Sequence, residues 1–272
     1  MRFFEKLAFV IVCCSATHLL AMTSASDDGR YPVFCHEAAN DPSLFTKFKQ
    51  SPVYTKILEH VTYEQGKSYL EIALRQSPDF RPNLDIFREN DRIGNPHVYE
   101  YGEFGVFSPT TLRYMKVASD LKKHFGTLNN MRIVEIGGGY GGQCLVLSKI
   151  FALGSYTIVD LPGPLELTKK YLESHGITNV HYIPSEAVSK MAPYDLVLSN
   201  YAFTECKKEF QDEYLEKVLG LGARGYLTCN YWDSTTYSKA ELLEKLNKMF
   251  PTVAEVPEEP LTCPGNYIIL WK

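Results

Sequence analysis

The sequence VEIGGGYGG at positions 134–142 contains five glycines in nine residues. It completes an apolar, β-rich run and leads into a segment with a helical pattern. A glycine-rich turn between a strand and a helix lets backbone N–H groups approach a ligand closely, and the helix N-terminus favours polar or anionic groups there. Such a strand–turn–helix unit is typical of doubly wound α/β sheets, which are therefore our first expectation for the fold.

Strand-like and helix-like patterns alternate from residue 131 onward. Short, nearly continuous apolar runs separated by helices are typical of a parallel sheet covered on both faces. Ser238 and Glu241 form a capping box that marks the start of one helix. We predict an α/β domain over residues 131–272, with a doubly wound, seven-stranded, mostly parallel Rossmann-like sheet. Its strands are expected at Arg132–Ile136, Tyr156–Asp160, Val180–Ile183, Asp195–Ser199, Tyr226–Asn230, Val253–Val256 and Asn266–Trp271.

Residues 27–130 have a different character. Segments Pro42–His60 and Tyr63–Arg75 have helical patterns, and a further helix is expected from Ser108 to Phe125. Between them, Pro78–Phe107 is rich in Pro, Gly, Asn and aromatic residues. Long irregular loops in compact proteins are often functional. We predict that this region forms a helical N-terminal cap with an ordered substrate loop, packed on the sheet domain.

The first 26 residues have the order of a secretory signal peptide. Arg2 and Lys6 precede an uncharged stretch, Leu7–Ser26, and acidic residues open the polar region that follows. A spanning helix needs about 20 mainly apolar residues, and the Ser, Thr and His residues of this stretch weaken that alternative. The leader predicts export or membrane association of the protein. A cytoplasmic protein is expected if the leader is not used.

The bulk composition argues against some classes of partner. A net charge of −4 and a pI near 6.0 provide no electrostatic footprint for nucleic acid, so no nucleic-acid partner is expected. The cysteines outside the leader are widely spaced and form no Cys-x-x-Cys pair, so no metal site is predicted. Nothing in the sequence indicates an oligomeric state.

The glycine spacing alone fits two ligand classes. Gly137, Gly139 and Gly142 match the dinucleotide pattern, whereas Gly137, Gly139 and Gly141 match the pattern for a nucleoside-methionine ligand. Glu135 favours the second class. A charge at the end of a buried strand is costly unless it meets a partner, and a pyrophosphate would be repelled by it. S-adenosylmethionine (SAM) instead carries an ammonium and a sulfonium, which a carboxylate accommodates.

Polar residues follow other strands at the same predicted edge. Asp160 ends the second strand, where a carboxylate can accept both ribose hydroxyls of either ligand class. Glu186 follows the third strand at a position suited to an adenine contact, and Asn200 ends the fourth. The complete set of predicted cofactor contacts is Glu135, Gly137, Gly139, Tyr140, Gly141, Asp160, Leu161, Glu186 and Asn200.

Several motifs resemble a known family. MRIVEIGGGYGGQ, YTIVDLPGP and YDLVLSNYAFTE look like the first, second and fourth motifs of class I SAM-dependent methyltransferases. NDRIGNP (90–96) and SPTTLRYMKVASDL (108–121) look more specifically like bacterial sugar O-methyltransferases, and the similarity covers roughly residues 85–272. The resemblance implies an antiparallel final strand, SAM as the cofactor, and a small-molecule or glycan hydroxyl as the methyl acceptor.

Transfer to a sugar hydroxyl calls for a base or a metal ion, because the hydroxyl is weakly acidic. His97 is the preferred candidate, and the neighbouring Tyr99 and Glu100 are expected to contact a sugar. Glu205, after the fourth strand, is the rival base. Both are expected on loops over the crevice at the strand ends.

Arg113 and Tyr114 precede the first strand and are expected to bind the SAM carboxylate or a substrate anion, and Asp233 is a weaker substrate-binding candidate. Two other functional classes stay open at this point. An NAD(P)-binding oxidoreductase would use the same glycine turn, and a non-catalytic SAM- or glycan-binding module would use the same crevice.

Overall fold

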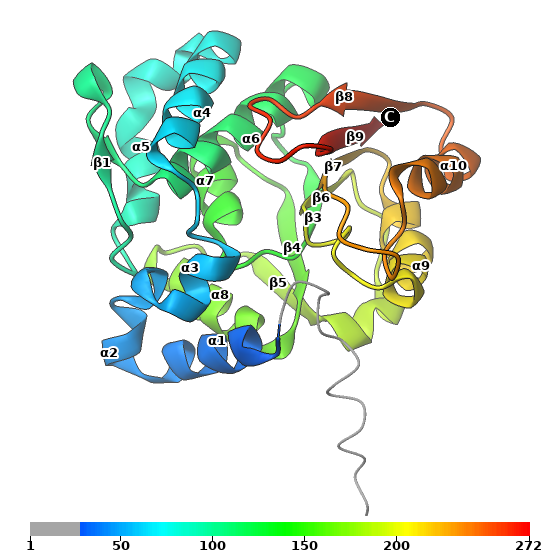
Figure 1. Ribbon diagram of the computed structural model, residues 1–272, viewed down its shortest axis with the longest axis horizontal. Helices are drawn as coiled ribbons and strands as arrows, with labels where there is room; N and C mark the ends of the chain where they lie inside the picture. The colour runs from blue at the N-terminus through cyan, green and yellow to red at the C-terminus, as the bar shows by residue number, and fades with distance from the viewer. Residues whose placement is uncertain (1–27) are drawn as a thin grey trace, which may run out of the picture.

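The computed structural model describes residues 28–272 (Figure 1). Its main sheet has seven strands in the order β5-β4-β3-β6-β7-β9-β8. The first five strands in this order are parallel, and β9 runs antiparallel to both of its neighbours, β7 and β8. The strands are β3 (Arg132–Ile136), β4 (Ser155–Asp160), β5 (Val180–Pro184), β6 (Leu196–Asn200), β7 (Gly225–Cys229), β8 (Val253–Pro257) and β9 (Tyr267–Trp271).

The doubly wound, mostly parallel sheet predicted from the sequence is confirmed. No strand end differs from its predicted position by more than one residue. The antiparallel final strand implied by the resemblance is also present. The capping box of helix α10 (Lys239–Met249) forms as predicted, with both reciprocal contacts between Ser238 and Glu241.

Helices cover both faces of the sheet (Figure 1). On one face, Ile133 and Ile158 pack under α6 (Pro109–Phe125), α7 (Gly142–Ile150) and α8 (Pro162–Ser174). On the other face, the adjacent residues Val134 and Val159 pack under α9 (Lys208–Lys217) and α10. Successive strand residues point to opposite faces, so a sheet that is buried on both sides needs the unbroken apolar runs seen in the sequence.

The N-terminal region is more broken than the sequence indicates. The helix expected over Pro42–His60 is wrong as a single element, because Ser51 is extended (φ −62°, ψ 133°) ahead of Pro52. A residue before proline is disfavoured in the helical conformation, so the helix ends and a new one begins. The region contains α1 (Arg30–Asn40), α2 (Pro42–Phe45), α3 (Pro52–Ile57), α4 (Tyr63–Gln76), α5 (Leu84–Arg88) and the hairpin strands β1 (Tyr99–Glu100) and β2 (Val106–Phe107). Short 3-10 turns lie at Phe48–Gln50, Pro78–Asn83, Glu89–Asp91 and Gly102–Phe104, and others at Ser185–Lys190 and Leu219–Leu221.

The N-terminal helices pack directly on the helices of the sheet domain. A Cβ at Gly163, in the first turn of α8, would lie 2.1 Å from the backbone oxygen of Pro32 in α1, so the two helices approach closely there. Buried side chains of α1, α4 and α6 belong to the same hydrophobic core as those of α7 and α8. The predicted leader lies outside the described residues. Within residues 28–272, no helix has the length and apolar character that crossing a membrane requires.

A buried lysine lies beneath the glycine turn. Lys49 is fully buried, its Nζ donates a hydrogen bond to the carbonyl of Asn90 at 2.6 Å, and it lies 4.1 Å from the ring centroid of Tyr140 and 5.0 Å from that of Tyr171. The Asn90 amide also donates to the Tyr140 hydroxyl at 2.9 Å. The rings accommodate the cation, but burial still lowers the pKa of Lys49 to about 8. This cluster anchors the middle of the glycine turn to the cap.

We expect stability to depend on pH through Lys49. Its pKa is about 8 in the folded protein and near 10.5 in the unfolded chain, so between these values the unfolded chain binds more protons and stability rises with pH. Relative to Lys49→Met, the free energy of unfolding of the wild type should increase by roughly 3 kcal/mol from pH 8 to 10.5. Urea unfolding at a series of pH values measures this. Parallel pH profiles for the two proteins would contradict the assignment.

Candidate active site

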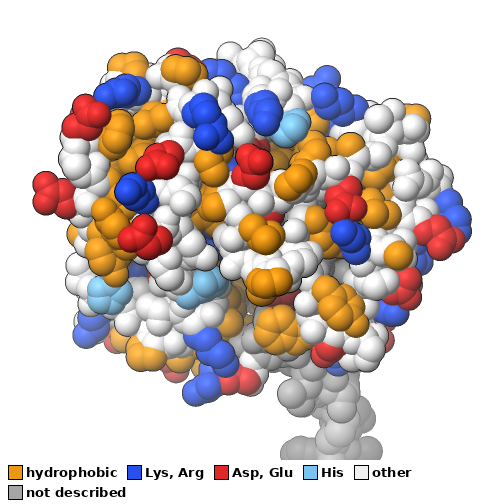
Figure 2. Space-filling model, turned by 45° about the horizontal axis from the view of Figure 1, so that its top comes forward, with side chains coloured by type: hydrophobic (Ala, Val, Ile, Leu, Met, Phe, Trp, Pro, Cys, Tyr) orange, Lys and Arg blue, Asp and Glu red, His pale blue; other side chains and the backbone are white. Residues whose placement is uncertain are grey.

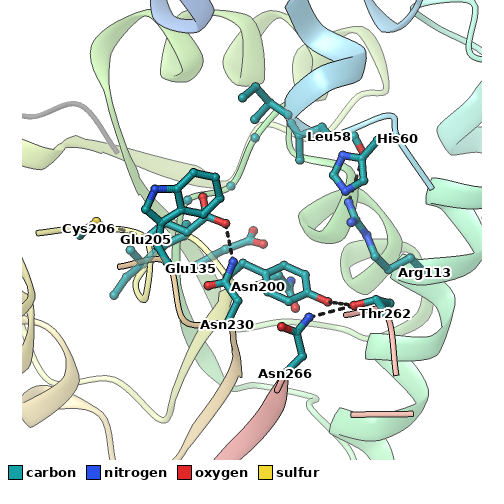
Figure 3. Close-up of a pocket in the computed structure, with 18 of the residues that line it drawn as sticks. Leu58, His60, Arg113, Glu135, Asn200, Glu205, Cys206, Asn230, Thr262 and Asn266 are labelled. Atoms are coloured by element: carbon teal, nitrogen blue, oxygen red, sulfur yellow. Dashed lines mark hydrogen bonds between the residues drawn. The ribbon is translucent and has the colours of Figure 1, made fainter. Parts of the chain in front are cut away.

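A cavity of about 730 Å³ opens at the carboxyl ends of β3, β4, β6 and β7. The strand order reverses beside β3, because β4 and β5 lie on one side of it and β6 and β7 on the other. Ligands of open α/β sheets bind at this kind of switch point. Residues of the cap and of the segment that joins β8 to β9 complete the walls (Figure 3).

The glycines of the turn have no room for a side chain, and two of them also line the cavity with a positive φ. Gly137 and Gly139 have φ values of 76° and 59°, in the left-handed region that favours glycine. A Cβ would lie 2.0 Å from Cβ of Ala202 at the first position and 2.8 Å from Cδ1 of Leu58 at the second. The backbone of the turn therefore lines the cavity directly, and the cap residue Leu58 covers it.

Glu135 is buried at the end of β3, with 2% of its surface exposed, and it lines the cavity. The hydroxyl of Tyr156 donates a hydrogen bond to its Oε2 at 2.8 Å. Burial raises the pKa of Glu135 to about 8, although this hydrogen bond opposes the shift. No Lys, Arg or His of residues 28–272 lies within ion-pair distance of it. A cationic ligand would stabilise its ionised form.

Asp160 ends β4 beside the glycine turn. Its Oδ1 accepts the backbone N–H of Leu161 at 2.8 Å, and its Oδ2 accepts that of Gly139 at 3.3 Å. Burial raises the pKa of Asp160 to about 6, and the backbone donors limit the shift. With this pKa the carboxylate is mostly ionised near pH 7, and it lines the cavity, where it can accept further hydrogen bonds.

Polar side chains from β6 and β7 form another wall (Figure 3). Asn200 ends β6, and its side-chain oxygen accepts a hydrogen bond from Thr228 at 3.2 Å. Glu205 follows in the next turn, and its Oε1 accepts a hydrogen bond from the amide of Asn230 at 2.8 Å. That contact orients the Glu205 carboxylate at the cavity.

The residue after β6 has an unusual backbone. Tyr201 has φ 68°, which is rare for a residue with a large side chain. Its hydroxyl donates a hydrogen bond to Glu258 and lies 3.2 Å from the hydroxyl of Thr262, so it joins the end of β6 to the segment before β9. The sequence placed Tyr201 at the end of the fourth strand, but no local pattern predicts a positive φ for tyrosine, and sequence reasoning did not assign it to the site. It also missed the cap residues Leu58, His60 and Tyr69, which reach the cavity through the packing of the cap.

Most of the predicted site residues line the cavity, and Arg113 and Glu205 are labelled in Figure 3. The predicted residues that reach it are Glu135, Gly137, Gly139, Asp160, Leu161, Asn200, Arg113, Tyr114 and Glu205.

The preferred catalytic histidine lies elsewhere. His97 is exposed and does not line the cavity, and the same holds for Tyr99 and Glu100, which form strand β1 of a small surface hairpin. The expectation that this loop crosses over the strand ends is wrong, because β1 pairs with β2 at the outer edge of the cap instead (Figure 1).

Four other predicted residues are also outside the cavity wall. Tyr140 is fully buried in the aromatic cluster around Lys49, so its ring faces the core. Gly141 caps α7 with φ 89°, and Glu186 is exposed. Asp233 accepts the backbone N–H of Thr235 at 2.7 Å in an exposed turn.

The cavity meets the requirements of SAM. It combines a turn without side chains, a carboxylate for hydroxyl groups at Asp160 and a buried carboxyl at Glu135 that no cation of the described chain neutralises. Across residues 28–272, no group of three or more His, Cys, Asp or Glu side chains could hold a metal ion. These features agree with a SAM-dependent methyltransferase that has a Rossmann-like fold.

Two curated proteins to which the chain is similar are methyltransferases. The chain is 23% identical over 177 residues to protein-L-isoaspartate O-methyltransferase of Pyrococcus horikoshii, covering 64% of this chain and 76% of that protein. It is 27% identical over 197 residues to human arsenite methyltransferase, covering 66% of this chain and 49% of the relative. The solved structure of mitomycin 7-O-methyltransferase is 14% identical, with a TM-score of 0.43 and coverage of 58% and 56%.

No family model matches the chain. The predicted enzyme class and the predicted cofactor, SAM, are confirmed by the curated relatives, whereas membership of the narrower sugar O-methyltransferase family is not shown. The two curated relatives are named for acceptors as different as a protein isoaspartate and arsenite. These relatives therefore indicate no single class of acceptor for this chain.

Asp160→Ala should weaken SAM binding about 10- to 100-fold, because it removes two hydrogen bonds to a charged acceptor. Glu186→Ala is the matched control, since this carboxylate lies outside the cavity wall, and it should leave the affinity unchanged. Isothermal titration calorimetry measures both dissociation constants, and thermal melting checks that each variant is folded. Equal SAM affinity of Asp160→Ala and the wild type would show that Asp160 does not bind the ribose hydroxyls.

Proposed function

We propose that this chain transfers the methyl group of SAM to a hydroxyl of a small sugar-like acceptor. The observation that carries the proposal is the composition of the cavity rim. Tyr231 and Trp232 line the cavity, yet 54% and 48% of their surfaces are exposed. Large aromatic faces that are left open to solvent beside a site offer flat apolar contact area to a ligand ring.

The same wall offers hydrogen-bonding groups of the kind that a polyhydroxylated acceptor needs. Asn230, Asn266 and Thr262 line the cavity, and amide and hydroxyl groups can both donate and accept. The amide of Asn266 donates to the Thr262 hydroxyl at 3.0 Å, so the two side chains support each other (Figure 3). An aromatic surface next to neutral polar groups suits a sugar ring, which has an apolar face and hydroxyls around its edge.

Glu205 is the base that this geometry favours. It lines the cavity between the end of β6 and the aromatic rim, and its hydrogen bond from Asn230 restricts its orientation. When bound, SAM supplies an electrophilic methyl group on its sulfonium. Glu205 would accept the hydroxyl proton of the acceptor as the new bond forms, a contribution of typically 10²–10⁴-fold. The aromatic rim and the amides would hold the acceptor in line with the methyl group, where orientation itself lowers the barrier.

Glu205→Gln should lower the turnover number by about 10²–10⁴-fold while SAM binding is retained, because the amide preserves the shape but cannot accept the proton. The assay follows transfer of label from methyl-labelled SAM to a panel of sugars and to small molecules of a host-cell extract. His97→Gln is the matched control and should keep wild-type turnover. Full activity of Glu205→Gln would reject this residue as the base. A wild-type protein that binds SAM and labels no acceptor would indicate a non-catalytic binding module.

Trp232→Ala should raise the KM for the acceptor about tenfold and leave SAM affinity unchanged, since one aromatic contact contributes on the order of 1 kcal/mol beyond its buried area. Tyr99→Ala removes a similarly exposed aromatic side chain on the surface hairpin and serves as the control. Steady-state kinetics with the labelled acceptor measures both. An acceptor KM that rises in Tyr99→Ala and not in Trp232→Ala would move acceptor binding to the hairpin.

A further inference from the structure

Two side chains on the cap side of the cavity have no part in the methyl transfer described above. Arg113 comes from α6, and His60 follows the short helix α3. Both line the cavity, and they lie beside each other on the side opposite Glu205 (Figure 3). The segments that carry them are also in contact, because Arg113 Nη2 donates to the backbone oxygen of Leu58 at 3.4 Å.

Arg113 lacks a counter-ion within the described chain. No Asp or Glu of residues 28–272 lies within 4 Å of its guanidinium, and its long hydrogen bond to Leu58 occupies one of five donors. The centroid of the Tyr114 ring lies 5.7 Å from its guanidinium carbon. Glu59 is the nearby acid, but burial raises its pKa, and its Oε1 is buried without a hydrogen bond. A guanidinium held this way at a cavity wall is suited to an anion from outside the chain.

His60 adds a neutral donor. Loss of hydration and then repulsion by Arg113 lower the pKa of His60 to about 4, so the imidazole is uncharged near pH 7. A neutral imidazole carries one N–H donor. A guanidinium fork with an adjacent N–H matches the two oxygens of a carboxylate. Two acids of the cavity, Glu135 and Glu205, lie away from this pair (Figure 3).

We propose that Arg113 and His60 form a carboxylate-binding subsite of the cavity. The inference rests on the proposed function, because the carboxylate belongs to a ligand of the methyl-transfer site. Two sources share this chemistry, namely the methionine portion of SAM and an acidic acceptor such as a sugar acid. In either case Arg113 binds through paired N–H donors, and the pair fixes the position of the ligand at the end of the cavity farther from Glu205.

Calorimetry with two pairs of probes tests the subsite. The first pair is S-adenosylhomocysteine and its decarboxylated analogue. The second is D-glucuronate and D-glucose, added to protein saturated with S-adenosylhomocysteine. In each pair one compound carries a carboxylate and the other lacks it. The ratio of their dissociation constants therefore reports what the carboxylate contributes to binding. The proteins are the wild type, Arg113→Gln, Arg113→Lys, His60→Asn and Lys56→Gln, the last removing a different cation at the same cavity.

We expect the wild type to prefer the carboxylate in one pair by about 10- to 100-fold. Arg113→Gln should abolish that preference, Arg113→Lys and His60→Asn should reduce it, and Lys56→Gln should retain it. Loss of preference for the nucleoside pair identifies SAM as the source, and loss for the sugar pair identifies the acceptor. Arg113→Gln with wild-type ratios for both pairs, or preference lost in Lys56→Gln instead, would overturn the subsite.

Thermal melting of each variant shows whether it is folded, and Arg113→Lys preserves the charge should Arg113→Gln unfold. The outcome also separates this inference from the function on which it rests. Wild-type protein that binds neither nucleoside would overturn the proposed function. Wild-type protein that binds both nucleosides equally, with no carboxylate preference for the sugars, would overturn only the carboxylate subsite.

Discussion

The absence of space for a side chain at the turn after β3 is the constraint on which the rest of the site depends. Ala202 lies against Gly137, and Leu58 lies against Gly139. The first contact brings the end of β6 against the turn, and the second brings the cap against it. Because both neighbours pack on bare backbone, the cavity is enclosed by three parts of the chain that are distant in sequence. A methyl group at either glycine would separate the walls that form the site.

The turn is also held from below. Tyr140, in the middle of the glycine motif, packs into an aromatic cluster and accepts a hydrogen bond from Asn90, while Lys49 lies against its ring. Asn90 and Lys49 both belong to the N-terminal region. The cap therefore contacts the turn at Tyr140 through these two residues and at Gly139 through Leu58. A preorganised turn can present its N–H groups to a ligand with little further ordering, and ordering is a main cost of binding.

The ionisable groups of the cavity are separated in a way that suits a ligand with charges of both signs. Carboxyl groups at strand ends, Glu135 and Asp160, belong to the sheet, and burial raises the pKa of each. The guanidinium of Arg113 comes from the helix before the sheet. On the face shown in Figure 2, acidic and basic side chains are interspersed, so the separation of charge within the cavity is a local feature. A cofactor that carries a sulfonium, an ammonium and a carboxylate matches this separation.

The sequence by itself determined the sheet, because apolar runs of strand length and the spacing of glycines are local consequences of burial and backbone geometry. It also placed Glu135, Asp160 and Asn200 correctly, since the ends of parallel strands meet at one edge whatever the loops do. Tertiary structure alone decided which loops reach that edge. His97 is exposed just before a hairpin of the cap. Pro52 interrupts a predicted helix, and Leu58 and His60 reach the cavity through the packing of the cap. These positions depend on contacts between distant segments, which no local pattern encodes.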